Sequence, residues 1–273
     1  MADQLPAAQT SVVYDGWGVR IHTFTSPDAF LANSTHIIES EHALVVIDGQ
    51  FVVPYAKQFR AYADSLGKPI DRVLLSHAHV DHFFGLGAAF TDVPVHALAE
   101  TISYIAEHGE SDRVERAQQY GPFVADRVVV PQTSIEPGTQ VIDGVTYEMA
   151  AVAGCETDHQ LVVHLPDLGV SIVQDLVYSG AHLYVTAHVQ GWVQELVDLQ
   201  STGSTLFLAG HGPAADKAEL ETNAEYLRTA ARILSEGADP VDYQNLMLAA
   251  YPDRTGSAIF DIYVPRLFAP AAL

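Results

Sequence analysis

The chain has few cationic residues and a large excess of acidic ones. Its 273 residues include 13 Lys and Arg against 34 Asp and Glu, a formal net charge of −21 at pH 7. The only lysines are Lys57, Lys68 and Lys217. Because such a surface repels phosphate backbones, we expect no nucleic-acid partner and no nuclease activity. Anionic substrates are steered poorly as well, unless bound metal ions dominate the field inside the pocket.

Cysteine and long apolar runs are also scarce. The single cysteine, Cys155, excludes an intrachain disulfide, which fits a reducing compartment, and we therefore expect a cytoplasmic protein. No apolar run approaches the roughly 18 residues of a membrane span, so we expect no membrane partner. Residues 1–10 lack the basic and apolar stretches of a secretory signal, although an export signal could have been removed. A small-molecule substrate fits these limits, and a homo-oligomer remains open.

The most informative stretch is Ser76-His77-Ala78-His79-Val80-Asp81-His82, which directly follows the apolar run at residues 72–75. Imidazole nitrogen and carboxylate oxygen are ligands that zinc and similar divalent ions prefer. In an extended or turning segment, residues i and i+2 point the same way, so His77 and His79 can bind one ion together. Asp81 and His82 then face a second position beside it.

This HxHxDH pattern at the end of a strand resembles the signature of the metallo-β-lactamase superfamily. The resemblance implies an α/β fold, a four-layer αβ/βα sandwich of two mixed sheets flanked by helices. Strands in each half of the chain, with helices between or after them, suit that architecture. We expect one such domain over residues 1–273, with the C-terminal helices from about residue 214 packed on it.

The same resemblance implies further metal ligands at later strand ends. Asp175 follows residues 170–174 and precedes Leu-Val, as in the family's G-D-L-V segment, with Gln174 replacing the glycine. His211 stands in Ala-Gly-His-Gly-Pro after a strand. At Asp48-Gly49 two interpretations stay open: a simple turn, or the family's Asp that hydrogen-bonds the metal loop.

The expected third histidine, in a G-H-T segment, is missing. The chain instead reads Gly154-Cys155-Glu156-Thr157. Three residues compete for this ligand position: Glu156, which resembles the Glu of the alkyl sulfatase branch, Cys155 and His159. We favour Glu156, because counting back from Asp175 and its hairpin without a gap places Glu156 where the resembled family carries the histidine. Charge balance supports this choice, since three carboxylates and one hydroxide would neutralise two divalent ions. The added carboxylate makes manganese or iron plausible beside zinc.

The function implied is a dinuclear metal-dependent hydrolase acting on an ester, lactone or thioester carbonyl. Asp81 is the expected catalytic residue, passing a proton to the leaving group. Tyr178 and His182 are candidates for substrate contact. The alternatives are a sulfate-ester hydrolase like the alkyl sulfatases, a promiscuous β-lactamase, a mono-iron oxidoreductase of the persulfide dioxygenase type, and a non-catalytic binding protein.

Local patterns give several secondary-structure predictions. Pro54 and Gly67 bracket a helix over residues 54–66. Residues 83–90 are expected to begin a helix, and residues 98–120 to be helical with a break at Gly109. Residues 126–131 read as a strand. Long and short C-terminal helices are expected over residues 214–236 and 242–250.

Overall fold

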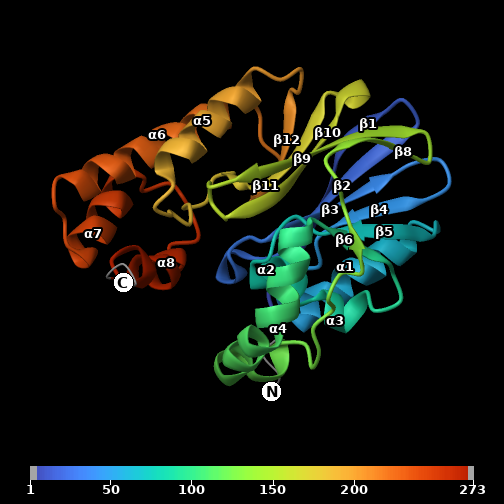
Figure 1. Ribbon diagram of the computed structural model, residues 1–273, viewed down its shortest axis with the longest axis horizontal. Helices are drawn as coiled ribbons and strands as arrows, with labels where there is room; N and C mark the ends of the chain where they lie inside the picture. Colours follow the sequence, from blue (N-terminus) through green and yellow to red (C-terminus); the bar gives the residue numbers. More distant parts are fainter. Residues whose placement is uncertain (1–4, 270–273) are drawn as a thin grey trace.

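Two β-sheets face each other across the centre of the computed structural model, which describes residues 5–269 (Figure 1). The first sheet has the strand order β1-β2-β3-β4-β5-β6-β7 and the second β12-β11-β10-β9-β8. In the first sheet β1 to β4 pair antiparallel and β4 to β7 parallel; in the second only β11 and β12 pair parallel. Both sheets are therefore mixed.

The strand bounds show how short the parallel part of the first sheet is. Its strands are β1 (Gln9–Gly16), β2 (Val19–Thr25), β3 (Ser34–Glu39), β4 (Leu44–Ile47), β5 (Ile70–Leu74), β6 (Val95–Ala97) and β7 (Thr133–Ser134). The second sheet consists of β8 (Gly138–Ile142), β9 (Val145–Ala153), β10 (His159–Leu165), β11 (Val170–Tyr178) and β12 (Leu206–His211).

The helices fall into two groups, one on the outer face of each sheet (Figure 1). The first sheet carries α1 (Val53–Ser65), α2 (Val80–Phe83), α3 (Leu86–Ala89) and α4 (Ala99–Tyr120). The second carries α5 (Val189–Gln200) and α6 (Lys217–Ser235), followed by α7 (Pro240–Ala250) and α8 (Ile259–Leu267). Single 3-10 turns occupy Asp28–Phe30, Gly121–Phe123 and Pro166–Leu168.

Three hydrophobic clusters hold these four layers together. One lies between the sheets and contains Ile38 of β3 and Leu161 of β10. The second lies between the first sheet and its helices, around Phe59 of α1, and the third joins the second sheet to α5 through α8, around Trp192. Each buried side chain of this size contributes about 1.5–3 kcal/mol to folding. The packing confirms the predicted αβ/βα sandwich, and it places the C-terminal helices against the second sheet.

Helix ends follow from local sequence. Pro54 stands in the first turn of α1, where the missing amide hydrogen costs no helical bond. The Asp216 carboxylate caps α6 by accepting from the backbone amides of Ala218 and Glu219. The predicted helices at 54–66, 214–236 and 242–250 all form, within a few residues.

Other local predictions are wrong. Helix α4 runs unbroken through Gly109. A Cβ at this position would lie 3.1 Å from Val128, so the glycine serves the close approach of the helix to that segment and does not end the helix. Residues 126–131 form no strand. The helix expected from residue 83 is two single-turn helices, α2 and α3, separated at Gly85, where a Cβ would collide with the Gly49 carbonyl oxygen. Helix α8 was not anticipated, because Pro265 lies inside it.

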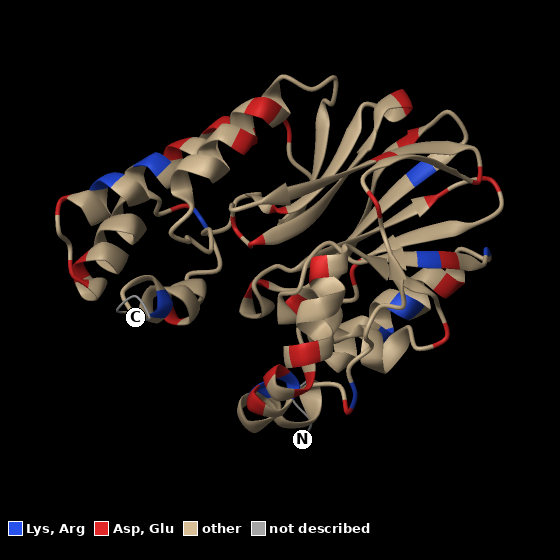
Figure 2. Ribbon diagram, viewed as in Figure 1, with Lys and Arg blue, Asp and Glu red and all other residues tan. Residues whose placement is uncertain are grey.

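Figure 2 shows the Lys and Arg residues scattered singly among more numerous Asp and Glu residues. No helix among residues 5–269 is long and apolar enough to span a membrane.

Candidate metal centre

The segment of residues 75–79, called the metal loop below, lies between the end of β5 and the single turn of α2. His77 is fully buried, whereas His79 is one-third exposed and stands at the N-cap of α2. Asp81 and His82 fall within α2, so the helical turn carries them away from the first two imidazoles. The change from extended backbone to helix thus divides the motif between two neighbouring positions, as predicted.

Two groups of potential ligand atoms converge here, each with all its atoms within 4.8 Å of one another. The first contains His77, His79, Glu156 and Asp175, and the second contains Asp81, His82 and His211. These side chains come from the metal loop, α2, the turn before β10, β11 and the end of β12. The structure therefore brings together all seven residues that the sequence suggested as ligands.

Asp175 stands between the two groups. Its Oδ1 lies 3.2 Å from His82 Nε2, and its Oδ2 lies 3.2 Å from His211 Nε2 and 3.7 Å from His77 Nε2. One carboxylate thus reaches imidazoles on both sides. Gly210 leaves room for it, because a Cβ at that position would overlap the Asp175 Oδ1.

Of the three candidates for the missing histidine position, Glu156 points into the cluster. Its Oε1 lies 3.2 Å from His79 Nδ1 and its Oε2 3.9 Å from His77 Nε2. The Cys155 thiol is instead directed to the Ala153 carbonyl oxygen, at 3.8 Å, and burial raises its pKa to about 12. His159 is exposed at the start of β10 and belongs to neither group of ligand atoms.

Asp48, at the end of β4, supports the metal loop from below. Its Oδ1 accepts from the Ser76 backbone amide at 2.8 Å, and its Oδ2 accepts from the Ser76 hydroxyl at 2.8 Å. Oδ2 also lies 2.7 Å from His82 Nδ1. Asp48 is completely buried and adopts a positive φ of 61°. Of the two interpretations left open for Asp48-Gly49, the structure supports the one that ties Asp48 to the metal loop.

Gln174 occupies the position before Asp175 where the family's G-D-L-V segment has a glycine. Its φ is 38°, in the left-handed region where glycine is normally found. Its side-chain amide donates to Asp48 Oδ2, across the gap between the two sheets. The hydrogen bond to a buried carboxylate offsets the backbone strain. Sequence analysis had no signal for this contact, because the two residues are 126 positions apart.

The carboxylates raise the pKa of three of the four cluster histidines, whereas burial keeps the pKa of His77 well below its usual value. Burial lowers the pKa of His79, but the negative charge of Glu156 outweighs it and raises the pKa to about 9. Burial likewise lowers the pKa of His82 and of His211, and Asp175 reverses the effect in both, so that both values are raised. The three carboxylates therefore create a field that attracts positive charge.

Several buried polar atoms in the cluster make no well-aligned hydrogen bond among residues 5–269, although two of them lie 3.2 Å apart as an ion pair between His82 and Asp175. They are His77 Nε2, His82 Nε2, Glu156 Oε2 and Asp175 Oδ1. Each such atom costs about 1–3 kcal/mol when left unsatisfied. All four are imidazole nitrogens or carboxylate oxygens, which are the ligand atoms that divalent metal ions bind. The residues present thus fit a pair of divalent cations.

The two predicted substrate contacts differ in position. Tyr178 lies within the site: its hydroxyl donates to Asp175 Oδ2 at 3.1 Å and its ring stacks on His211 at 4.6 Å. Burial and the nearby carboxylates keep the Tyr178 pKa well above its usual value, so the phenol stays protonated. His182 is buried elsewhere, with Nδ1 3.1 Å from the Tyr226 hydroxyl and its ring against Phe260. It lines neither cavity beside the cluster, so the structure does not support a substrate contact for it.

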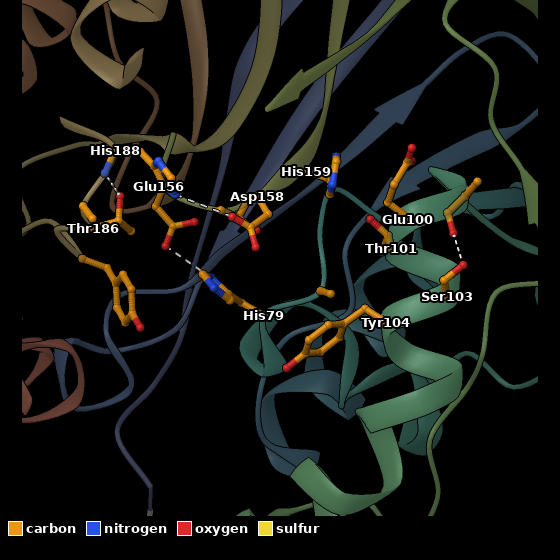
Figure 3. A pocket seen from close by; sticks show the side chains of 15 residues that line it. His79, Glu100, Thr101, Ser103, Tyr104, Glu156, Asp158, His159, Thr186 and His188 are labelled. Atoms are coloured by element: carbon orange, nitrogen blue, oxygen red, sulfur yellow. Dashed lines mark hydrogen bonds and ion pairs between the residues drawn. The ribbon is translucent and has the colours of Figure 1, made fainter. Parts of the chain in front are cut away.

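Two cavities open beside the ligand atoms. The first, of about 700 Å³, lies between the start of α4 and the turns at residues 156–159 and 184–188 (Figure 3). The second, of about 570 Å³, lies between α4 and α8 and is reached by Asp81, Asp175 and His211. His79, Tyr104 and Tyr184 belong to both walls. A substrate at the cluster can therefore extend to either side.

Tyr104, which lines both cavities, and the α8 residues that line the second cavity were not predicted from the sequence. Tyr104 falls on an otherwise polar face of a helix, which gives no functional signal. Helix α8 comes about 80 residues after the β11 ligand in the chain, so only the folded structure brings it to the cavity.

Comparison with known proteins agrees with this geometry. The sequence model of the metallo-beta-lactamase superfamily matches residues 28–224. Solved structures with the same fold include a metallo-beta-lactamase from Pontibacter korlensis, with 21% identity and a TM-score of 0.64 over 81% of this chain and 99% of that chain. Another is FIM-1 from Pseudomonas aeruginosa in a mono-zinc form, with 17% identity and a TM-score of 0.61 over 81% and 96%.

No curated protein matches the sequence significantly. At such identities the structural likeness shows the fold alone, whereas the superfamily match covers most of the chain. The chain belongs to the metallo-beta-lactamase superfamily.

Proposed function

We propose that the protein is a dinuclear metal-dependent hydrolase acting on an ester, lactone or thioester carbonyl. The observation that carries the proposal is the convergence of buried imidazole nitrogens and carboxylate oxygens on His77, His82, Glu156 and Asp175 that make no well-aligned hydrogen bond among residues 5–269. Burial of unsatisfied polar atoms on this scale is otherwise unfavourable, and two cations would satisfy all of them.

The seven clustered residues would hold the two ions. His77, His79 and Glu156 would bind one, Asp81, His82 and His211 the other, and Asp175 would reach both. Bound divalent ions supply an activated water near neutral pH and polarise a carbonyl oxygen. Zinc suits the imidazoles; manganese or iron suits the carboxylates as well.

Asp81 is the proposed catalytic residue. Its side chain is 16% exposed and lines the second cavity, whereas the other carboxylates of the cluster are almost fully buried. A carboxylate at that position can accept a proton from the attacking water and deliver it to the leaving group. Tyr178 lines the same cavity, and its hydroxyl can donate to a substrate oxygen when a metal ion takes its place at Asp175 Oδ2.

A sulfate ester is the second candidate substrate class, because Glu156 occupies the cluster where a histidine was expected and resembles the alkyl sulfatase branch in this respect. A β-lactam is a third, as a side activity. Hydrolysis of a carbonyl ester, a sulfate ester or a β-lactam requires attack of water on a polarised carbon or sulfur atom, so all three reactions would use the same residues.

Metal analysis combined with a substrate panel tests the proposal. About two zinc or manganese ions per chain and turnover of esters, lactones or thioesters would support it. One iron per chain with oxygen consumption would indicate an oxidoreductase of the persulfide dioxygenase type. A protein without metal and without turnover on carbonyl, sulfate and β-lactam substrates would be a non-catalytic binding protein.

A substitution tests Asp81 as the proton carrier, and metal content is measured in the same protein because Asp81 is also a proposed ligand. Asp81→Asn should reduce kcat by about 100-fold or more, since it removes the proton carrier. Asp71→Asn on the exposed side of β5 is the control and should keep full activity. Full turnover by Asp81→Asn would remove Asp81 from the mechanism.

A further inference from the structure

Arg266 of α8 lies in the wall of the second cavity, together with Asp81, Asp175 and His211 of the cluster. Helix α8 follows residue 224, where the superfamily match ends. The arginine therefore lies outside the part of the chain that the superfamily model matches.

Arg266 differs from every other arginine of the protein. The remaining nine each have a guanidinium nitrogen within 4.0 Å of a carboxylate oxygen; they are Arg20, Arg60, Arg72, Arg113, Arg116, Arg127, Arg228, Arg232 and Arg254. Among residues 5–269, Arg266 has no such partner, although acidic residues outnumber basic ones 34 to 13. An arginine left without a carboxylate in so acidic a protein is available for one from outside.

One hydrogen bond orients the Arg266 guanidinium. Its Nη1 donates to the Tyr184 hydroxyl at 2.8 Å. The Tyr184 ring lies 5.5 Å from the ring of His79, which belongs to the metal cluster. One tyrosine thus connects the guanidinium to the cluster, and the other guanidinium hydrogens remain free to donate.

We propose that Arg266, oriented by Tyr184, binds a carboxylate on the substrate, so that the natural substrate is a carbonyl compound carrying a second, anionic group. This inference rests on the proposed hydrolase function for the reacting end of the substrate. A planar guanidinium binds a carboxylate through two parallel hydrogen bonds.

The surrounding charges favour an anion with a single charge. Asp112, Glu115 and Asp261 also line the second cavity, and Arg116 there is already paired with Glu115 at 3.8 Å. A phosphate dianion would meet these acids with one unpaired arginine to offset them. A monoanionic carboxylate meets less repulsion, so the carboxylate is the class that the cavity favours.

Matched esters test the specificity. We would compare 4-nitrophenyl hydrogen glutarate with 4-nitrophenyl pentanoate, in which a methyl group replaces the carboxylate, and extend the pair to shorter and longer chains. The metal-loaded protein should show kcat/KM about tenfold or more in favour of the anionic ester of the best length, since hydrogen bonds to charged groups contribute this much. Arg266→Gln should abolish the preference, mainly through KM.

Two further variants are informative. Tyr184→Phe should weaken the preference less than Arg266→Gln, because the guanidinium keeps its charge but loses its hydrogen-bond partner. Arg228→Gln is the control: Arg228 pairs with Glu221 at 2.9 Å on α6 and lines neither cavity, so the preference should stay as in the unmodified protein.

A binding measurement separates this inference from the proposed reaction. The ketone 5-oxohexanoate cannot be hydrolysed, and its affinity for the metal-loaded protein is measured by calorimetry beside that of neutral 2-hexanone. Binding weakened about tenfold or more by Arg266→Gln, without hydrolysis of any ester, would support the anion site and overturn the carbonyl-hydrolase proposal. Ester hydrolysis with equal binding to both proteins, and no preference for anionic esters, would overturn the anion site alone.

Discussion

The Asp48 carboxylate holds His82 in place: Asp48 Oδ2 lies 2.7 Å from His82 Nδ1, so His82 Nε2 faces the metal cluster. The contact links the end of β4 to α2, two segments that are 34 residues apart. Because one ring nitrogen is engaged by a carboxylate, the other is the one available as a ligand.

Asp48→Asn should lower metal affinity by about 10–100-fold, the usual cost of losing a carboxylate that orients a ligand histidine. The amide also cannot accept all the hydrogen bonds that Ser76 and His82 direct at the carboxylate. Competition with a chromophoric chelator measures the change. Asp71→Asn serves as control, and equal affinities in the two variants would contradict the orienting role.

Gly210→Ala should reduce metal content by displacing Asp175, because the added Cβ would overlap the Asp175 Oδ1. Both residues are buried, so the neighbouring backbone cannot easily give way. Gly203→Ala is the matched control, since a Cβ there meets nothing within 4 Å. Metal content and thermal unfolding are measured for both proteins, and an unchanged metal content in Gly210→Ala would argue against Asp175 as a shared ligand.

Glu156→Gln should lose affinity for one of the two ions by about tenfold or more, because the variant keeps the shape of the side chain and removes its charge. Cys155→Ala and His159→Ala should bind metal normally, since neither side chain points into the cluster. Glu156→His should shift the preference towards zinc. If Glu156→His leaves both metal content and rates unchanged, the assignment of Glu156 as a ligand is wrong.

Glu39→Gln should destabilise the fold by about 1–3 kcal/mol at neutral pH, the range for a buried charge-assisted hydrogen-bond partner. Burial raises the pKa of Glu39, but hydrogen bonds from Arg20, Lys68 and His22 outweigh it and hold the pKa at about 2, below the usual 4.5. The ionised carboxylate therefore stabilises the folded state above about pH 4.5, and this contribution disappears as the pH falls towards 2.

Urea unfolding at several pH values checks the effect at Glu39. The difference between the unmodified protein and Glu39→Gln should shrink between pH 4.5 and 2. Glu41→Gln is the control, because the Glu41 side chain is 81% exposed and its loss should change stability little. A difference that stays constant with pH would show that Glu39 acts through packing and not through its charge.

The sequence by itself indicated the HxHxDH segment and, through its resemblance to a family, the fold and most of the candidate ligands. HxHxDH is local, so its chemistry can be read without a structure, and Asp175 and His211 stand in recognisable strand-end segments. The helices with clear caps and one apolar face were also predictable, because these features act over a few residues.

Only the tertiary structure showed which of the three candidate side chains points into the cluster. Glu156, Cys155 and His159 are close in sequence, and the backbone of one turn sends them in different directions. The Gln174–Asp48 contact and the approach of α8 to the cavity were likewise not predictable from the sequence. Gln174 and Asp48 are 126 residues apart, and α8 begins more than a hundred residues after α2. Contacts of that range depend on how the sheets and helices pack, and no local pattern encodes them.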